Sequence, residues 1–164
     1  MATILQQSGL CVEGAKLEYF PCMGGRTWYE GEFVYISGTA GQLKECASSA
    51  TNCVGMAASD NASKDANTMM PVYVCAPDTL YEVNVYHSTP ANATIAYGLV
   101  GQEFELFAGT NMQYCNREAT TAKFFHVEKL SPKDTQNDLF GRVIVKVTTI
   151  AAQTGRAAES NIPA

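Results

Sequence analysis

The stretch Leu80-Tyr81-Glu82-Val83-Asn84-Val85-Tyr86 decides the fold class, because its apolar and polar side chains alternate. Successive side chains of a β-strand point to opposite sides, so positions 81, 83 and 85 would form one apolar face. Similar short runs recur at 33–36, 101–107 and 142–147, with Gly, Pro, Asn, Asp and Ser between them. This spacing predicts a mainly β chain, with antiparallel strands in a barrel or sandwich.

The order of these patterns along the chain predicts three parts. Residues 1–30 read as an extended N-terminal arm, 31–150 as a β-rich domain and 151–164 as a flexible C-terminal tail. The β-rich domain forms either one body or two small lobes, 31–78 and 79–150. The polar composition of the last residues is typical of a chain end that a partner orders.

The arm carries a concentration of aromatic residues, namely Tyr19, Phe20, Trp28 and Tyr29. Exposed aromatic side chains near a chain end are typical anchors for a partner surface. These four are therefore the candidate interface residues. The alternative is that the same rings fold back onto the core of the domain, and the sequence does not favour one interpretation over the other.

Composition limits the classes of partner. Charged residues make up 16% of the 164 residues, below the roughly 25% of a typical soluble domain, which indicates either a large core or a surface covered by neighbours. The net charge is −5 and no Lys/Arg cluster occurs, which argues against direct nucleic-acid binding. No apolar run reaches the 18 or so residues of a membrane helix, and MATILQQ at the start does not resemble a signal peptide. We therefore expect that the chain does not associate with a membrane and that it is synthesised in a cytosol.

The sequence offers little catalytic or metal-binding chemistry, so we expect no enzyme, no cofactor and no metal site. His87 and His126 are the only histidines, and neither has a Cys or Asp at the spacing that activates a nucleophile. The acidic loops 59–68 and 131–138 lack the Gly or the closing Glu of a calcium loop. Their Asp and Asn residues are more typical of turns that they stabilise by hydrogen bonds to the backbone.

Six cysteines, at 11, 22, 46, 53, 75 and 115, contain no Cys-x-x-Cys pair. Zinc ligands usually come in such close pairs, and disulfide frameworks accompany secretion. We therefore expect free thiols packed as small apolar side chains.

Several segments, in chain order, carry a family resemblance: GEFVYI (31–36), CVGMA (53–57), MPVYVCAPDTLYEV (70–83), VGQEFEL (100–106), FFHV (124–127) and DLFGRVIVKV (138–147). Together they resemble the head decoration, or cement, proteins of tailed bacteriophages. The resemblance covers most of 31–147 and rests on strand and turn residues. Residues 1–30 and the tail do not contribute to it.

The resemblance implies a small β-rich virion protein, often a homotrimer, that binds the outside of the capsid. It would bridge subunits of the major capsid protein and stabilise the head, after assembly in the host cytoplasm. The family has no catalytic residues to carry over. Two alternatives stay open: another phage structural component, such as a head fibre or tail subunit, and a carbohydrate-binding β module that stacks surface aromatics on sugar rings.

Overall fold

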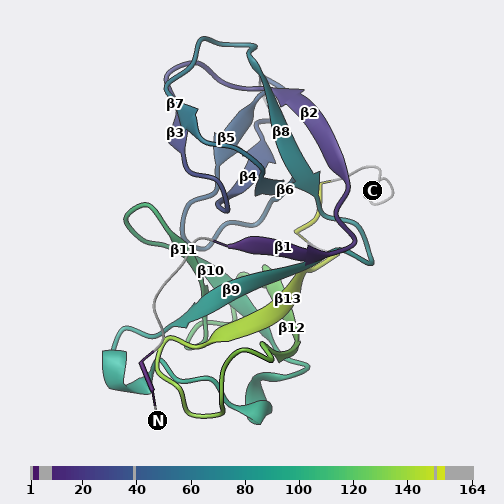
Figure 1. The fold of residues 1–164 in the computed structure, drawn as a ribbon. Helices are drawn as coiled ribbons and strands as arrows, with labels where there is room; N and C mark the ends of the chain where they lie inside the picture. The colour runs from purple at the N-terminus through teal and green to yellow at the C-terminus, as the bar shows by residue number, and fades with distance from the viewer. Residues whose placement is uncertain (1, 4–8, 39, 150, 154–164) are drawn as a thin grey trace.

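The structure is a computed structural model that describes residues 2–3, 9–38, 40–149 and 151–153 (Figure 1). Its strands are β1 (Leu10–Glu13), β2 (Leu17–Pro21), β3 (Thr27–Trp28), β4 (Phe33–Ile36), β5 (Leu43–Glu45), β6 (Gly55–Ala57), β7 (Asn61–Ala62), β8 (Met69–Val74), β9 (Leu80–Tyr86), β10 (Glu103–Ala108), β11 (Gln113–Asn116), β12 (Phe125–Leu130) and β13 (Arg142–Val147). Two short 3₁₀ turns, η1 (Pro90–Asn92) and η2 (Tyr97–Leu99), complete the described elements. The chain is mainly β, as the sequence predicted. No helix of the described residues is long and apolar enough to cross a membrane.

A closed five-stranded barrel forms the C-terminal half of the fold. Its strands follow the order β9, β11, β10, β12, β13, and β13 pairs back to β9. Strands β9 and β11 run parallel, with Val85 opposite Cys115, and the other pairings in the barrel are antiparallel. The turn at 109–111 joins β10 to β11 as a hairpin, and Asn111 takes the positive φ of 62° that such turns favour.

Strand β9 contributes its predicted apolar face to the barrel interior, where these side chains are buried. The opposite face is also buried, because the loop before β13 covers it. The Glu82 carboxylate accepts hydrogen bonds from the Ser131 hydroxyl at 2.6 Å and from the Lys133 ammonium at 3.0 Å. The Asn84 amide donates to the carbonyl of Phe140. The alternating pattern of β9 alone would place Glu82 and Asn84 in water. The loop before β13 covers them instead and supplies their hydrogen-bond partners.

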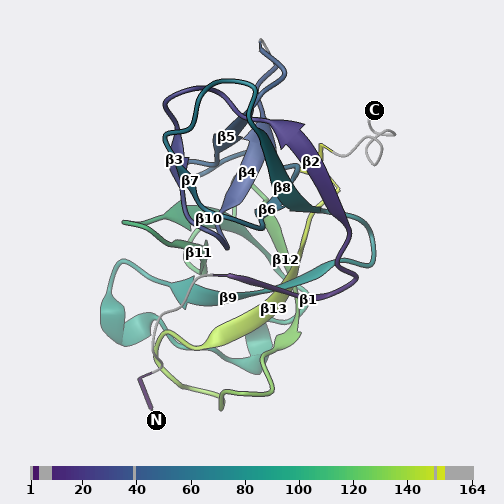
Figure 2. The same cartoon turned by 45° about the horizontal axis from the view of Figure 1, so that its top comes forward.

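A second sheet, in the order β2-β8-β6-β4-β5, comes from the N-terminal half and is antiparallel throughout. The two-residue strands β3 and β7 pair beside it. Figures 1 and 2 both show this sheet stacked on the barrel, with β1 and β9 at the junction. The connection between Val74 and Leu80 separates the two bodies, close to the boundary expected between lobes 31–78 and 79–150.

The sheet and the barrel share one hydrophobic core, so they are not independent lobes. Phe33 of β4 is fully buried and lies edge-on to Tyr81, Phe124 and Phe125, with ring centroids 5.1 to 5.6 Å apart. Aromatic rings prefer this geometry, which adds to the free energy gained by burying their area. A second cluster, which includes Trp28, lies on the other side of the sheet.

The N-terminal segment is extended, as expected, but it is paired in the fold and does not project as a separate arm. Strand β1 pairs with β9 of the barrel, β2 with β8 of the sheet, and β3 with β7. Residues 10–28 therefore belong to the β domain, which corrects the boundary drawn at residue 30. The reason is that these strands complete edges whose backbone groups would otherwise lack partners.

The predicted tail begins inside the fold. Ala151 is 1% exposed, and the Gln153 side chain accepts a hydrogen bond from the N–H of Ile36 at 2.8 Å and donates to its carbonyl at 2.9 Å. The rest of the predicted tail, 154–164, lies outside the described residues.

Candidate interaction surface

Most of the large apolar side chains that are exposed gather on the first two strands and their neighbours. Leu10 and Val12 lie on β1, Leu17 and Tyr19 on β2, and Met69 on β8, each between 43 and 57% exposed. Single exposed apolar residues are ordinary, but a contiguous group indicates a place where another molecule binds.

The register of β2 against β8 shows why these residues form one face. Residues opposite each other in an antiparallel pair point to the same side of the sheet. The pairs on the side of β2 and β8 that also carries Met56 and Phe33 are all apolar, and they are Leu17 with Tyr73, Tyr19 with Pro71, and Pro21 with Met69. The intervening pairs, Glu18 with Val72 and Phe20 with Met70, place both β8 side chains in the core. We call these six residues, together with Leu10 and Val12, the apolar face, in which Tyr73 is partly buried against the shared core.

Strand β1 continues the apolar face toward the barrel. A hollow of about 100 Å³ is lined by Leu10 and Cys11 of β1 and by Met56 and Tyr73 of the sheet. A neighbouring hollow of about 380 Å³ is lined by Leu10 and Tyr29, with the acidic residues Glu30 and Asp60 at its rim. The apolar face is therefore uneven, with small depressions that suit side chains of a partner protein.

Two of the three strands that carry the apolar face, β1 and β2, are also edge strands. Within the described residues, β1 pairs only with β9 and β2 only with β8. An edge strand presents unpaired N–H and C=O groups, and natural proteins usually protect such edges with charges, bulges or covering chain. Glu13 on β1 and the ion pair of Lys16 with Glu18, at 3.4 Å, place charges beside these edges, and the register of β1 shifts between Cys11 and Glu13. Strand β2 pairs with β8 without a shift, so a partner that adds to β2 would gain both apolar and backbone contacts.

The four aromatic residues predicted as interface residues separate into two pairs. Tyr19 is 57% and Tyr29 41% exposed, and both border the surface just described. Phe20 packs against the second core cluster, and Trp28 is 1% exposed within it. The structure therefore corrects the expectation for Trp28, and largely for Phe20, because these rings fold back onto the domain. The aliphatic members of the face were not singled out from sequence, although the alternation of Leu17, Tyr19 and Pro21 carries the signal.

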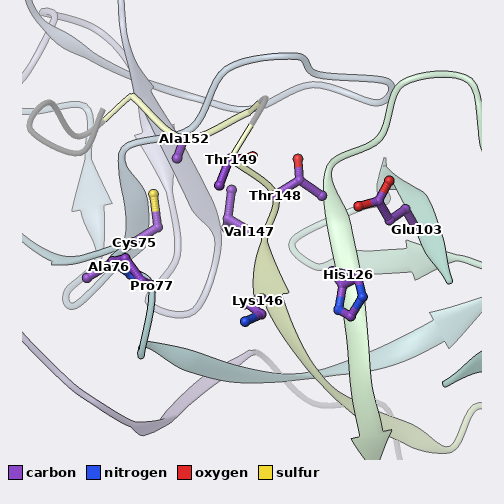
Figure 3. Close-up of a pocket in the computed structure, with 10 residues that line it drawn as sticks. All are labelled: Cys75, Ala76, Pro77, Glu103, His126, Lys146, Val147, Thr148, Thr149 and Ala152. Carbon is purple, nitrogen blue, oxygen red and sulfur yellow. The ribbon is translucent and has the colours of Figure 1, made fainter. Parts of the chain in front are cut away.

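A larger cavity, of about 480 Å³, lies between the barrel and the connection from β8 to β9 (Figure 3). Its apolar lining comes from Cys75, Ala76, Pro77, Val147 and Ala152, and its polar lining from Glu103, His126, Lys146, Thr148 and Thr149. We call it the Cys75 cavity.

The charged groups of the Cys75 cavity lie on three adjacent barrel strands. Glu103 is opposite His126, and His126 is opposite Lys146. Glu128 contacts both His126, at 2.8 Å from Nδ1, and Lys146, at 3.5 Å from Nζ. The carboxylate of Glu103 is 3.6 Å from the ammonium of Lys123. The rim therefore carries both signs of charge, and these charges are already paired with each other or with neighbouring side chains.

The cysteines and acidic loops behave as structural groups. All six thiols are free, and all except Cys11 are buried. Burial raises the pKa of Cys53 well above its usual value, and the contact with the Cys53 thiol, together with burial, does the same for Cys75. A thiol with a raised pKa is a poor nucleophile at neutral pH.

Among the described residues, no group of three or more His, Cys, Asp or Glu side chains is placed to hold a metal ion.

The two acidic loops use their side chains to hold turns. In the loop 131–138, the Asp138 carboxylate accepts a hydrogen bond from the N–H of Thr135 at 2.7 Å. In the loop 59–68, the side chain of Asn61 accepts one from the N–H of Lys64 at 2.9 Å. Both contacts confirm the interpretation of these loops as turns stabilised by side chains.

Comparison with known proteins adds no relative to this description. The chain matches no protein-family model, and no curated protein is significantly similar to it.

Proposed function

We propose that this chain is a virion structural protein that binds the outer surface of a phage capsid and stabilises the head by bridging subunits of the major capsid protein. The observation that carries the proposal is the apolar face, formed by the edge strands β1 and β2 together with β8 of a rigid β scaffold. The resemblance of the sequence to decoration proteins supplies the identity of the partner. A homotrimer is part of the same proposal.

The physical argument concerns what a bridging protein must do. Packaged DNA presses outward on a capsid, and a protein that binds only the assembled shell shifts the equilibrium toward that shell. Such a protein needs a rigid body and a contact patch that is apolar at its centre. The shared core around Phe33 supplies the rigid body. Leu17, Tyr19 and Met69 supply apolar area at the surface.

The direct test is binding to phage heads that lack this protein. Purified wild-type chain is mixed with DNA-filled heads, and bound protein is measured after sedimentation. We expect Tyr19→Asp to weaken binding at least tenfold, because the substitution places a charge in the centre of the apolar face. Tyr97→Asp is the matched control, since Tyr97 is 70% exposed on η2, away from that face. Equal binding by wild type and Tyr19→Asp would refute the assignment of the face.

A second measurement separates decoration from the other virion roles. Native particles are fractionated on a density gradient, and the copy number of the chain is determined by mass spectrometry. Decoration predicts a copy number close to that of the major capsid protein. A few copies per particle would instead indicate a fibre or tail subunit. Recovery only outside particles would overturn both the decoration role and the fibre or tail role. Mass photometry of the purified chain tests the trimer.

A further inference from the structure

Three buried thiols, those of Cys46, Cys53 and Cys75, gather where the sheet meets the barrel. All three side chains belong to the shared core around Phe33, and each is at most 3% exposed. The Cys53 thiol contacts both of the other two. Two thiols in contact can be oxidised to a disulfide, so the cluster is a candidate site of covalent modification. This argument is independent of the proposed capsid role.

The backbone makes Cys53 and Cys75 diagonal neighbours on two paired segments. The N–H of Cys75 donates to the carbonyl of Val54 at 3.0 Å, just beyond the paired ends of β6 and β8. Opposed residues of an antiparallel pair have Cα atoms about 5.5 Å apart, so Cys53, next to Val54, lies within about 7 Å of Cys75. This separation is within the reach of a disulfide.

The side chains of these two cysteines also lie on the same side of the strands. Val54 packs in the second core cluster, whereas Cys53 and Cys75 both pack in the shared core. The Cys75 sulfur is 3.4 Å from the carbonyl oxygen of Cys53. Figure 3 shows this sulfur directed toward Ala152, the residue that a β-bridge pairs with Cys53. The contact between the two thiols therefore agrees with the placement of their backbones.

Cys75 is the member of the cluster that a small reagent can reach. It lines the Cys75 cavity, whereas Cys46 and Cys53 are not among the lining residues. The Cys46 thiol donates instead to the carbonyl of Asn52 at 3.4 Å. A reagent that enters the cavity therefore meets Cys75 first, with the Cys53 thiol next to it.

We propose that Cys53 and Cys75 form a redox-active pair, which a small aliphatic disulfide oxidises to a bridge that stabilises the fold. The Cys75 thiolate first attacks one sulfur of the reagent, which gives a mixed disulfide and releases one reagent thiol. The Cys53 thiolate then attacks the Cys75 sulfur and releases the second reagent thiol. The two-electron oxidation of the protein pair is thus matched by reduction of one reagent disulfide to two thiols.

The bridge would act on the junction of the sheet with the end of the described chain. The N–H of Cys53 donates to the carbonyl of Ala151 at 2.8 Å, and its carbonyl accepts from the N–H of Gln153 at 2.7 Å. Cys53 and Cys75 are 22 positions apart in the sequence. A disulfide that closes a loop of this length stabilises a protein mainly by restricting its unfolded state.

The test oxidises the folded full chain and locates the bridge. The Cys11→Ser background removes the thiol that is not buried. The chain is treated with 2-hydroxyethyl disulfide at about pH 9, because contact with the Cys53 thiol and burial raise the pKa of Cys75 and make its thiolate scarce at neutral pH. Free thiols are then blocked, and a digest is mapped by mass spectrometry without reduction. We expect one linked peptide pair, which joins Cys53 to Cys75.

Two variants control for the choice of partner. Cys75→Ala should leave Cys53 as a free thiol after treatment. Cys46→Ala is the matched control, because it removes the other thiol in contact with Cys53, and it should keep the bridge. A wild-type bridge between Cys46 and Cys53, a mixed disulfide that stays on Cys75, or an unreacted Cys75 would each overturn the proposal.

Urea denaturation tests whether the bridge stabilises the fold. The midpoint of the oxidised chain should rise by about 1 M or more, given the length of the closed loop, and dithiothreitol should restore the original value. The Cys75→Ala variant should show the same midpoint before and after treatment. An unchanged or lower midpoint in the bridged chain would refute the stabilising role.

Discussion

The side chain of Gln113 bonds both backbone groups of Phe33 and thereby joins the barrel to the sheet. Gln113 lies on β11 and Phe33 on β4. The Gln113 amide oxygen accepts from the N–H of Phe33, and its nitrogen donates to the carbonyl of Phe33 at 3.3 Å and to that of Cys46 at 2.9 Å. Phe33 is fully buried and Gln113 is 5% exposed. One amide side chain therefore satisfies the backbone of β4 at the junction, where no neighbouring strand supplies a partner for the N–H.

Replacing this amide should destabilise the whole chain. Gln113→Leu keeps the approximate volume but removes the partners of the Phe33 N–H and the Cys46 carbonyl. Each buried backbone group without a partner costs about 1–3 kcal/mol, so we expect a loss of about 2–6 kcal/mol in the free energy of unfolding. Urea denaturation measures this loss. Gln102→Leu is the control, because Gln102 is exposed, and it should change stability by less than about 0.5 kcal/mol.

Gly55 is a second position at which the structure predicts the effect of a substitution on folding. A Cβ at residue 55 would lie 2.1 Å from the carbonyl oxygen of Tyr73, on the paired strand β8. Backbone cannot move by that amount without separating β6 from β8, so Gly55→Ala should yield little folded protein. Gly98→Ala is the matched control, since a Cβ there meets no atom within 4 Å. Circular dichroism and thermal unfolding compare the two, and an intact Gly55→Ala variant would contradict the packing of β6 on β8.

Local patterns were enough to predict the strands of the barrel. The runs 80–86 and 142–147 are strands with the same bounds in the structure. Closure of the barrel could not be predicted, because the parallel contact of Val85 with Cys115 joins residues 30 positions apart. Nothing in either strand specifies its neighbour. Pairing of distant strands is decided by the shared core, which only the whole chain forms.

The candidate surface shows the same limit. Tyr19 and Trp28 are both aromatic, and each lies within three residues of a Pro or Gly in the sequence, yet one is exposed and the other buried. The difference comes from the partners of their strands. Tyr19 is opposite Pro71 of β8, on the side away from the second core cluster, and Trp28 is opposite Asn61 of β7 and is buried within that cluster. The sequence showed a segment rich in aromatic residues, but only strand pairing decides which of their rings lie at the surface.

Alanine substitutions should separate these two rings. Trp28→Ala removes a large side chain that is 1% exposed, and we expect it to cost about 3–5 kcal/mol in unfolding free energy. Tyr19→Ala should cost less than about 1 kcal/mol, since the ring is mostly in water. Trp28→Phe is a useful intermediate, because the Trp28 indole N–H has no hydrogen-bond partner among the described residues. It should retain most of the stability, and equal losses for Trp28→Ala and Tyr19→Ala would contradict the assignment of one ring to the core.

The ion pair of Asp134 with Arg142 predicts how stability depends on pH. The Asp134 carboxylate accepts from the Arg142 backbone N–H at 2.7 Å and from its guanidinium Nε at 2.8 Å. Burial alone would raise the pKa of Asp134, but the Arg142 side chain, backbone N–H and charge outweigh it and lower the pKa below its usual value. Because this pKa is lower in the folded chain, the ionised Asp134 carboxylate makes its full contribution to the free energy of unfolding above the unfolded pKa of about 3.9. It is lost as the pH falls through the lower folded value.

Asp134→Asn should therefore lose stability in a way that depends on pH. The deficit relative to wild type should be constant from pH 6 to 8, at about 3 kcal/mol for breaking a buried pair, and should shrink below about pH 4. Urea denaturation across this range measures it. Asp65→Asn is the control, because Asp65 is an exposed loop aspartate, and its stability should follow the wild-type curve. A deficit in Asp134→Asn that stays constant down to pH 2 would show that the carboxylate contributes through packing and not through its charge.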